Sequence, residues 1–367
     1  MRYFSQFTSN TLAGSANQHF FTLSEGEKRT GRVFYRITNG GTFNYSLLFS
    51  NTIDSTYHDG SISHRNLLCD EWFIHQARAG RCGACEDWQQ LAEMPQSWQT
   101  LTFGGSVQKA VMPGEMFASD PLSLTFEKDE YLCVEITFSG TMIPYHEESI
   151  LPIFCSSQGQ WVYDKHMPLP SMVGCDQPRR LRIGFLGDSI TQGIGTPINA
   201  YTHWNAVTAR RLGDAYLYWN LGIGYARAND MAQDGAWLFK AKQNDLVVLC
   251  AGVNDMGWIA NAAQTCADLQ RVVRLLHQAG CKVAVQTLPP FDYQGETIER
   301  WLTCNRFIRE ELSKEADLIF DVVPLLGLSE TEPWKARYGG HPNEEGCAAW
   351  GEALAQALLQ SGLISKS

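Results

Sequence analysis

The chain lacks the features that mark nucleic-acid-binding and membrane proteins. Its 367 residues carry a formal net charge of −10 and contain no long run of lysine or arginine, so we expect no nucleic-acid partner. No apolar run approaches the length of a membrane-spanning helix, so we expect no membrane partner either. The amino-terminal residues lack the basic-then-apolar pattern of a secretory signal peptide. These absences predict a cytoplasmic, globular protein.

The cysteines form neither a recognisable disulfide framework nor a complete metal site. There are eleven of them, an odd number spread over both halves of the chain, which favours reduced thiols. Cys82 and Cys85 have the C-x₂-C spacing of one half of a tetrahedral zinc site. No second pair with a matching spacing follows, so we interpret this segment as a surface loop that carries cysteines. We therefore predict that the protein binds no metal ion.

The chain also lacks a phosphate-binding glycine loop. Residues 187–195 contain several glycines, but neither G-x-x-x-x-G-K-[ST] nor G-x-G-x-x-G occurs there. We therefore expect no bound nucleotide and no organic cofactor.

The first half of the chain has the pattern of a β-rich domain. Short apolar or alternating runs, separated by turns rich in glycine, asparagine and aspartate, are typical of an all-β sandwich or jelly roll. The clearest runs are 32–37, 45–49, 122–126 and 131–138. We predict an accessory domain of this type over residues 1–175, followed by a proline-containing linker.

From residue 180 to residue 367 the pattern changes, because strand-like runs now alternate with helical ones. Such alternation predicts an α/β domain with a parallel sheet covered by helices on both faces. The predicted strands are 182–187, 216–220, 246–250, 282–286 and 318–322. The predicted helices lie near 201–212, 229–242, 261–279, 297–315 and 344–361.

Ser189 is the first candidate for a catalytic residue. It lies in Gly187-Asp188-Ser189, directly after the first predicted strand and before a helix. In an open α/β sheet the ligand crevice lies at the carboxyl ends of the strands. A nucleophilic serine there needs a base that takes its proton, donors for the oxyanion, and a group that orients the base.

Three later loops supply residue types that such a serine needs. Gly222 follows the second predicted strand, and a glycine lets a backbone N–H approach a substrate oxygen closely. Asn254 follows the third strand, where its side-chain amide could reach the same oxygen. His341 precedes the last helix and could act as general base. Because parallel strands end at one edge of the sheet, we expect these residues to converge.

In order along the chain, Gly187-Asp188-Ser189, Gly222, Gly252-Val253-Asn254-Asp255 and His341-Pro342-Asn343 resemble the four sequence blocks of the SGNH (GDSL-type) esterases and acylhydrolases. The resemblance covers the carboxyl-terminal half and implies a flavodoxin-like, three-layer α/β/α fold. It implies Ser189 as nucleophile and His341 as base. It also implies an oxyanion hole made by the N–H groups of Ser189 and Gly222 with the Asn254 amide. Asp188 and Asp255 would hold the loops.

Tyr338 departs from this family, which usually has an aspartate three residues before the histidine. A phenol is neutral near pH 7 and cannot supply the charge of a carboxylate. A backbone carbonyl could orient His341 and give a Ser–His dyad, a distant carboxylate could do so, or the site could be weak or inactive. Glu330, Glu332 and Glu344 are the carboxylates considered. We prefer the dyad, because the two-domain order without that aspartate resembles carbohydrate acetyl-esterases.

The resulting prediction is a serine esterase that forms an acyl-enzyme on Ser189. Its expected substrate is a short-chain acyl ester, preferably an acetyl ester, of a carbohydrate or small metabolite. Trp258 is a candidate for substrate contact because aromatic rings suit sugars, although tryptophan also fills cores. The alternatives are a lysophospholipase or thioesterase and an inactive carbohydrate-binding protein. The sequence leaves the oligomeric state open, a homo-oligomer included.

Overall fold

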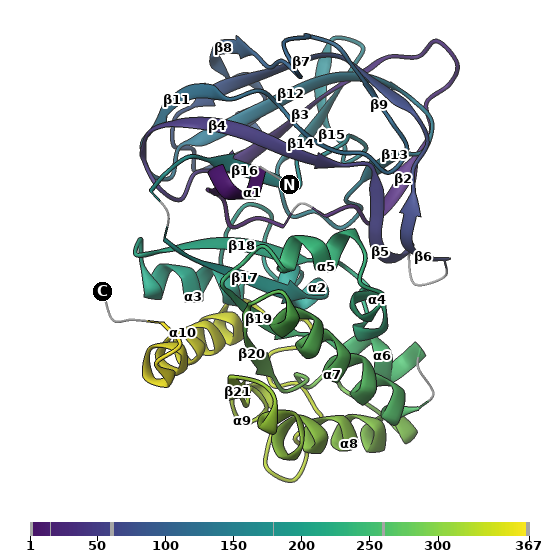
Figure 1. Cartoon of the computed structure of the whole chain (residues 1–367), viewed down its shortest axis with the longest axis vertical. Helices are drawn as coiled ribbons and strands as arrows, with labels where there is room; N and C mark the ends of the chain where they lie inside the picture. Colours follow the sequence, from purple (N-terminus) through teal and green to yellow (C-terminus); the bar gives the residue numbers. More distant parts are fainter. Residues whose placement is uncertain (1–2, 15, 59–61, 179, 259–260, 365–367) are drawn as a thin grey trace. The chain divides into compact units, whose positions relative to one another are not determined.

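The chain, described here by a computed structural model, divides into two compact units (Figure 1). Residues 1–54 and 64–179 form the first unit, and residues 55–63 and 180–367 form the second. The structure describes all residues except 1–2, 15, 59–61, 179, 259–260 and 365–367, and it describes the backbone alone for 3, 55–58, 62–64 and 258. None of the described helices is long and apolar enough to cross a membrane. The domain bounds 1–175 and 180–367 stay a prediction.

The first unit is rich in antiparallel strands, in agreement with its short alternating runs. The elements from the amino terminus through this half of the chain are α1 (Tyr3–Gln6), β1 (Thr8–Ser9), β2 (His19–Phe21), β3 (Arg29–Arg36), β4 (Gly41–Ser50), β5 (Thr52–His58), β6 (Ile62–Leu68), β7 (Trp72–Cys82), η1 (Trp88–Glu93), β8 (Gln96–Thr100), β9 (Lys109–Val111), β10 (Met116–Ala118), β11 (Leu122–Phe126), β12 (Tyr131–Gly140), β13 (Ile143–Tyr145), β14 (Ile153–Ser157), β15 (Gln160–Tyr163) and β16 (Met172–Cys175).

Two larger sheets organise these strands. One has the order β1-β16-β4-β10, with β11 also paired to β4. The other has the order β15-β14-β3-β12-β7-β8, with β9 also paired to β7. Strand β12 is central in the second sheet, and part of one face packs under η1 through Phe34, Leu91, Tyr131 and Cys133. Their arrangement as a β-sandwich or jelly roll stays a prediction.

The second unit contains a five-stranded sheet whose pairs are all parallel. Its strands are β17 (Leu181–Gly187), β18 (Tyr216–Gly222), β19 (Leu246–Cys250), β20 (Lys282–Gln286) and β21 (Leu318–Phe320), in the order β18-β17-β19-β20-β21. In chain order this is 2-1-3-4-5, the flavodoxin-like order. The five strands predicted from the sequence are therefore confirmed, with ends that differ by at most two residues.

Helices lie on both sides of this sheet, with α3 and α10 on one side and α7 on the other (Figure 1). The helices of this half are α2 (Ser189–Gln192), α3 (Trp204–Leu212), α4 (Ala228–Ala232), α5 (Ala236–Ala241), α6 (Val253–Trp258), α7 (Ala262–Gln278), α8 (Glu296–Glu310), η2 (Leu312–Lys314), α9 (Val323–Leu326) and α10 (Glu344–Ser361). Stacked rings of Trp204 and Trp350, with centroids 4.8 Å apart, join α3 to α10. Because both faces are covered, β18 and β19 are buried along their whole length, as expected for a parallel sheet.

The single helix predicted over 229–242 is wrong, because the structure has α4 and α5 there instead. Asp234 lies between them with a φ of 58°, a left-handed conformation that an α-helix cannot continue through. Gly235 then serves as the N-cap of α5. The other predicted helices are present, and α3 begins later than expected, at Trp204.

The register of the three neighbouring strands places the predicted site loops together. Gly187, the last residue of β17, lies beside Gly222 in β18 and beside Cys250 in β19. Ser189, the loop after Gly222, and Asn254 therefore follow adjacent strand ends. Since the chain order reverses between β17 and β19, this edge is the topological switch point, where open α/β sheets bind ligands.

Candidate functional site

Ser189 is the first residue of α2 and is 7% exposed. Asp188 caps this helix, because its Oδ1 accepts a hydrogen bond of 3.0 Å from the Ile190 N–H. Gly187 permits the tight turn that precedes the serine. A Cβ at Gly187 would lie 2.0 Å from Thr191 Oγ1 and 2.3 Å from the Cys250 carbonyl oxygen. The strand-to-helix turn thus fixes where the Ser189 side chain begins.

His341 lies directly against Ser189, with 2.8 Å between its Nε2 and the serine Oγ. The two residues are 152 positions apart in the sequence, so the fold alone brings them together. His341 belongs to the loop before α10, whose N-cap Asn343 accepts a 3.0 Å bond from the Gly346 N–H. Burial lowers the pKa of His341 below its usual value, and no nearby charge contributes. The imidazole is therefore biased toward its neutral form, which can accept a proton.

No carboxylate contacts the other side of the imidazole within the described ranges of the chain, where the Ser189 contact is the one hydrogen bond of His341. Tyr338 packs its side chain against Gly346, where an added Cβ would lie 2.7 Å from the Tyr338 Cβ. Glu332 pairs with Lys335 instead, and Glu330 and Glu344 are exposed. The structure thus contains the Ser–His pair without the carboxylate. Among the described residues, His341 also donates no hydrogen bond to a backbone carbonyl.

Gly222 packs tightly under the nucleophile helix, since an added Cβ would lie 2.1 Å from the Gln192 backbone nitrogen. Its N–H donates a 2.9 Å hydrogen bond to Asn220 Oδ1. The backbone group that the sequence offered as an oxyanion donor therefore already has an acceptor in this structure. The donor role of Gly222 stays a prediction, while its close-packing role follows from the contacts.

Asn254 lies in the first turn of α6, directly beyond the end of β19. Its Nδ2 donates a 2.9 Å hydrogen bond to the Ala226 carbonyl oxygen, which fixes the orientation of the amide group. A carboxamide nitrogen carries two hydrogens, so this bond uses one of them. This bond joins the loops after β18 and β19 to each other.

Asp255 is buried next to Asn254 and connects the same two loops. Its Oδ2 accepts a 3.0 Å hydrogen bond from the Ala228 N–H. Burial raises the pKa of this carboxyl to about 7. These contacts, like the capping bond of Asp188, are those of a residue that holds loops in place. Trp258 ends α6, and its side chain lies outside the described residues, so its contact with substrate stays a prediction.

The two cysteines with zinc-like spacing are not brought together with other ligands. Cys82 is buried at the end of β7, and burial raises the pKa of its thiol to about 12. The Cys85 Sγ donates to the Asp87 carbonyl oxygen at 3.1 Å. Over the described ranges, no group of three or more His, Cys, Asp or Glu side chains could hold a metal ion.

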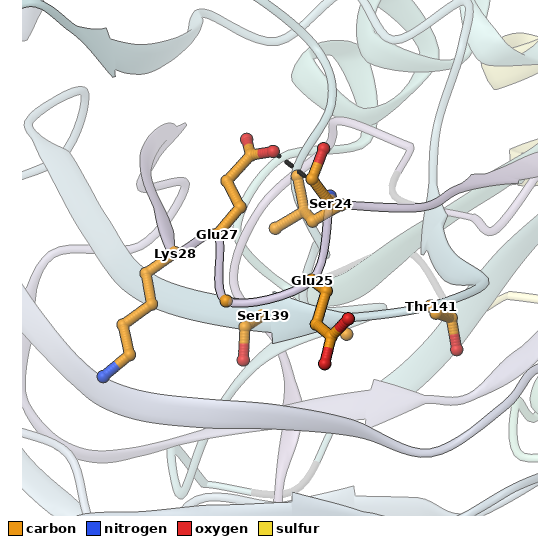
Figure 2. A pocket seen from close by; sticks show the side chains of 9 residues that line it. Ser24, Glu25, Glu27, Lys28, Ser139 and Thr141 are labelled. Atoms are coloured by element: carbon orange, nitrogen blue, oxygen red, sulfur yellow. Dashed lines mark hydrogen bonds between the residues drawn. The ribbon is translucent and has the colours of Figure 1, made fainter.

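A cavity of about 320 Å³ occurs in the first unit, between the turn at 23–28 and the end of β12 (Figure 2). Figure 2 shows Glu27 turned back toward Ser24, whose N–H donates to its carboxylate at 3.2 Å. None of the predicted site residues lines this cavity.

One neighbour of the site had no signal in the sequence. Phe291 lies in the loop after β20, and its ring meets the His341 ring edge-on, with centroids 5.2 Å apart and an interplanar angle of 79°. The segment Pro289-Pro290-Phe291 indicates a loop, but nothing in it indicates which ring the phenylalanine contacts.

Comparisons with known proteins show what the second half of the chain is similar to. Residues 185–349 match the model of the GDSL-like Lipase/Acylhydrolase family. An acetylxylan esterase of Xylanibacter ruminicola is 25% identical over 253 residues, which is 60% of this chain and 49% of that protein. The chain thus spans about half the length of this curated relative.

Solved structures of similar proteins cover about half of the chain. A carbohydrate acetylesterase from Sinorhizobium meliloti is 17% identical and covers 49% of this chain and 99% of its own, with a TM-score of 0.40. The acetyl xylan esterase AlAXEase is 20% identical and covers 49% and 100%, with a TM-score of 0.38. Over residues 185–349, this chain is thus similar to the GDSL-like Lipase/Acylhydrolase family.

Proposed function

We propose that the protein is a serine esterase in which Ser189 is the nucleophile and His341 is the general base. The observation that carries this proposal is the 2.8 Å contact between Ser189 Oγ and His341 Nε2. A base must lie within hydrogen-bond reach of the proton that it removes, and this distance satisfies that condition. The family match of residues 185–349 supports the same reaction class.

The reaction would proceed through an acyl-enzyme. The Ser189 hydroxyl gives its proton to His341 Nε2 while Oγ forms a bond to the ester carbonyl carbon. The carbonyl oxygen becomes an oxyanion, and the bond to the alcohol oxygen then breaks as His341 returns the proton to that oxygen. A water molecule, deprotonated by the same imidazole, attacks the acyl group, and the Ser189 Oγ leaves with the proton.

The oxyanion would be stabilised by the Ser189 N–H and by the Asn254 amide. Ser189 opens α2, and the first N–H groups of a helix have no partner within the helix. The Asn254 amide is oriented by its bond to the Ala226 carbonyl, and its second N–H is the donor that we assign to the oxyanion. Fixed donors of this kind need no rearrangement during the reaction. Gly222 would join them only by giving up its bond to Asn220.

We propose a short-chain acyl group, in particular acetate, on a carbohydrate or small metabolite as the substrate. The name of the curated relative, an acetylxylan esterase, supports this class. We further propose a cytoplasmic location, which eleven cysteines without a disulfide support because disulfides persist mainly in oxidising compartments. Cell fractionation tests the location independently of the activity.

The catalytic roles can be tested by two substitutions. We expect Ser189→Ala and His341→Ala each to abolish hydrolysis of p-nitrophenyl acetate, while the exposed control Ser329→Ala retains it. A fluorophosphonate probe should label Ser189 in the unchanged protein and fail to label Ser189→Ala. Undiminished hydrolysis in either catalytic variant would overturn the proposal. Absence of both hydrolysis and labelling in the unchanged protein would instead favour an inactive carbohydrate-binding protein.

The acyl group is tested separately by a chain-length series of p-nitrophenyl esters. We expect kcat/KM to be highest for acetate and to fall as the chain lengthens. A maximum at long chains would contradict the acetyl-esterase proposal and favour a lysophospholipase or thioesterase. Release of acetate from acetylated xylan oligosaccharides, compared with acetylated small alcohols, then identifies the alcohol part.

A further inference from the structure

The imidazole of His341 has one hydrogen-bond partner in the described part of the chain, and it is the residue that it is meant to deprotonate. A single bond at Nε2 leaves the ring able to swing about its side-chain torsions. In serine proteases, where an aspartate holds the other nitrogen, removal of that function lowers turnover by about 10⁴. No second polar contact within the described residues holds this ring.

The side chain of Phe291 packs against this ring. The two ring centroids lie 5.2 Å apart at 79°, which is the edge-to-face geometry that aromatic pairs favour. The same phenylalanine also contacts the backbone beside the histidine. A Cβ added to Gly340 would lie 3.0 Å from two carbons of the Phe291 ring, so the backbone approaches the ring closely.

The loops that carry Phe291 and His341 are also joined by a hydrogen bond. Asp292 Oδ1 accepts a 2.9 Å bond from the Ala336 N–H, five residues before the histidine. The loop after α2 contacts the histidine backbone as well, because a Cβ at Gly195 would lie 2.8 Å from the His341 and Pro342 carbonyl oxygens. Neighbouring loops thus pack closely against the backbone of His341, and Phe291 packs against its side chain.

We propose that Phe291 is a positioning residue that holds the His341 imidazole against Ser189, in the place where related serine hydrolases use a carboxylate. This inference rests on the proposed function, because it assigns Phe291 a role only if His341 is the base. An apolar ring supplies orientation without charge. It also keeps water from the imidazole, which agrees with burial as the cause of the lowered His341 pKa.

Phe291→Ala tests the proposal. We expect kcat for p-nitrophenyl acetate to fall about tenfold, the factor at the upper end of what an aromatic pair contributes, with KM nearly unchanged. The acid limb of the pH–rate profile should move to higher pH, because water reaches the imidazole and its pKa rises toward the ordinary value. Labelling of Ser189 by a fluorophosphonate should slow by a similar factor. The half-buried Phe239→Ala serves as matched control and should change none of these quantities.

Two further variants separate positioning from folding. Phe291→Tyr keeps the ring and should restore most of the activity, whereas Phe291→Leu keeps much of the volume without the ring and should not. Circular dichroism melting identifies any variant that fails to fold. If Phe291→Leu melts like the unchanged protein and has its full kcat and pH profile, Phe291 is not a positioning residue.

Gly340→Ala offers a test that leaves the phenylalanine in place. The new methyl group would press on the Phe291 ring, so we expect a lower kcat and a displaced pH limb. In the double variant Gly340→Ala/Phe291→Ala, the new methyl group no longer meets the phenylalanine ring. Gly340→Ala should therefore lower kcat little beyond the effect of Phe291→Ala alone. Full additivity of the two effects would contradict the proposal. These outcomes are distinct from a failure of the proposed function, which Ser189→Ala reveals by retaining activity.

Discussion

Gly187 and Cys250 lie side by side at the ends of two parallel strands, so close that a Cβ on the glycine would be 2.3 Å from the cysteine carbonyl oxygen. The same Cβ would be 2.0 Å from Thr191 Oγ1. The absence of a side chain at Gly187 therefore sets the geometry of the turn that leads to Ser189. Substitutions around this turn test how closely the site depends on it.

Gly187→Ala should destabilise the second unit and remove most of the hydrolytic activity. The methyl group cannot be accommodated without a backbone shift, and overpacking of this kind costs about 1–3 kcal/mol. Denaturant unfolding and p-nitrophenyl acetate hydrolysis measure the two effects. Gly257→Ala is the matched control for stability, because an added Cβ there meets nothing within 4 Å. Equal stability of the two variants would contradict the prediction.

The activity should persist at lower pH than the ordinary pKa of histidine suggests. Burial lowers the pKa of His341, so its neutral form, the form that accepts the serine proton, survives to more acidic solution. The acid limb of kcat/KM should therefore lie below about 6.5, the usual value for histidine. A pH–rate profile with an uncharged ester measures it, and a limb above that value would show that a charge supports the imidazolium.

Asn254→Ala should lower kcat by about 10²–10³, the usual cost of removing an oxyanion donor, with a small change in KM. Asn254→Asp is a useful companion because it keeps the size of the side chain but cannot donate a hydrogen bond when ionised. Steady-state kinetics of both variants, with melting curves to check the lost bond to Ala226, provide the measurement. Unchanged turnover in Asn254→Asp would remove this residue from the oxyanion hole.

Asp255 should make the protein less stable as the pH rises from about 4 to about 7. Burial raises its pKa in the folded protein to about 7, above the usual value of about 3.9 for an aspartate, so in this window the folded state holds a proton that the unfolded state has released. The stabilisation that Asp255 contributes is thus fully present at pH values below its pKa in the unfolded chain. It is lost as the pH rises through its pKa in the folded protein. Urea unfolding of Asp255→Asn should show a smaller decline over this window. An identical decline in both proteins would mean that Asp255 does not titrate there.

Tyr338→Asp tests whether a carboxylate can support His341. We expect the pKa of His341 to rise because a nearby negative charge favours the imidazolium, which moves the acid limb to higher pH. Tyr338→Phe, which keeps the packing against Gly346, is the control and should leave the limb in place. If Tyr338→Asp folds and its limb does not move, the new carboxylate does not reach the imidazole.

The pairing of Ser189 with His341 could be predicted because parallel strands end at one edge of a sheet. The order of the loops along the chain is then enough to predict which loops meet. The same logic predicts that Gly222 and Asn254 lie at or after strand ends next to that of β17, and the register pairs Gly222 with Gly187 while Asn254 lies in the first turn of α6, after β19. It could not show that the Gly222 N–H bonds to Asn220, since that bond depends on one side-chain torsion. The contact of Phe291 with His341 could not be predicted for a related reason. Edge-to-face packing between residues of distant loops produces no recognisable pattern in the sequence. The break between α4 and α5 was not predicted, because the residue with the left-handed conformation is Asp234. A glycine at that position would have indicated such a conformation, whereas an aspartate does not.

The 152-residue separation between Ser189 and His341 has a consequence for synthesis on the ribosome. A nascent chain that has emerged only as far as β20 contains the proposed nucleophile and the proposed oxyanion loops but lacks the proposed base. The histidine arrives just before α10, which docks on α3 through Trp204 and Trp350. Esterase activity should therefore appear late and abruptly during translation. In a series of ribosome-stalled chains of increasing length, the shortest chain that hydrolyses an ester should be the one in which α10 has docked.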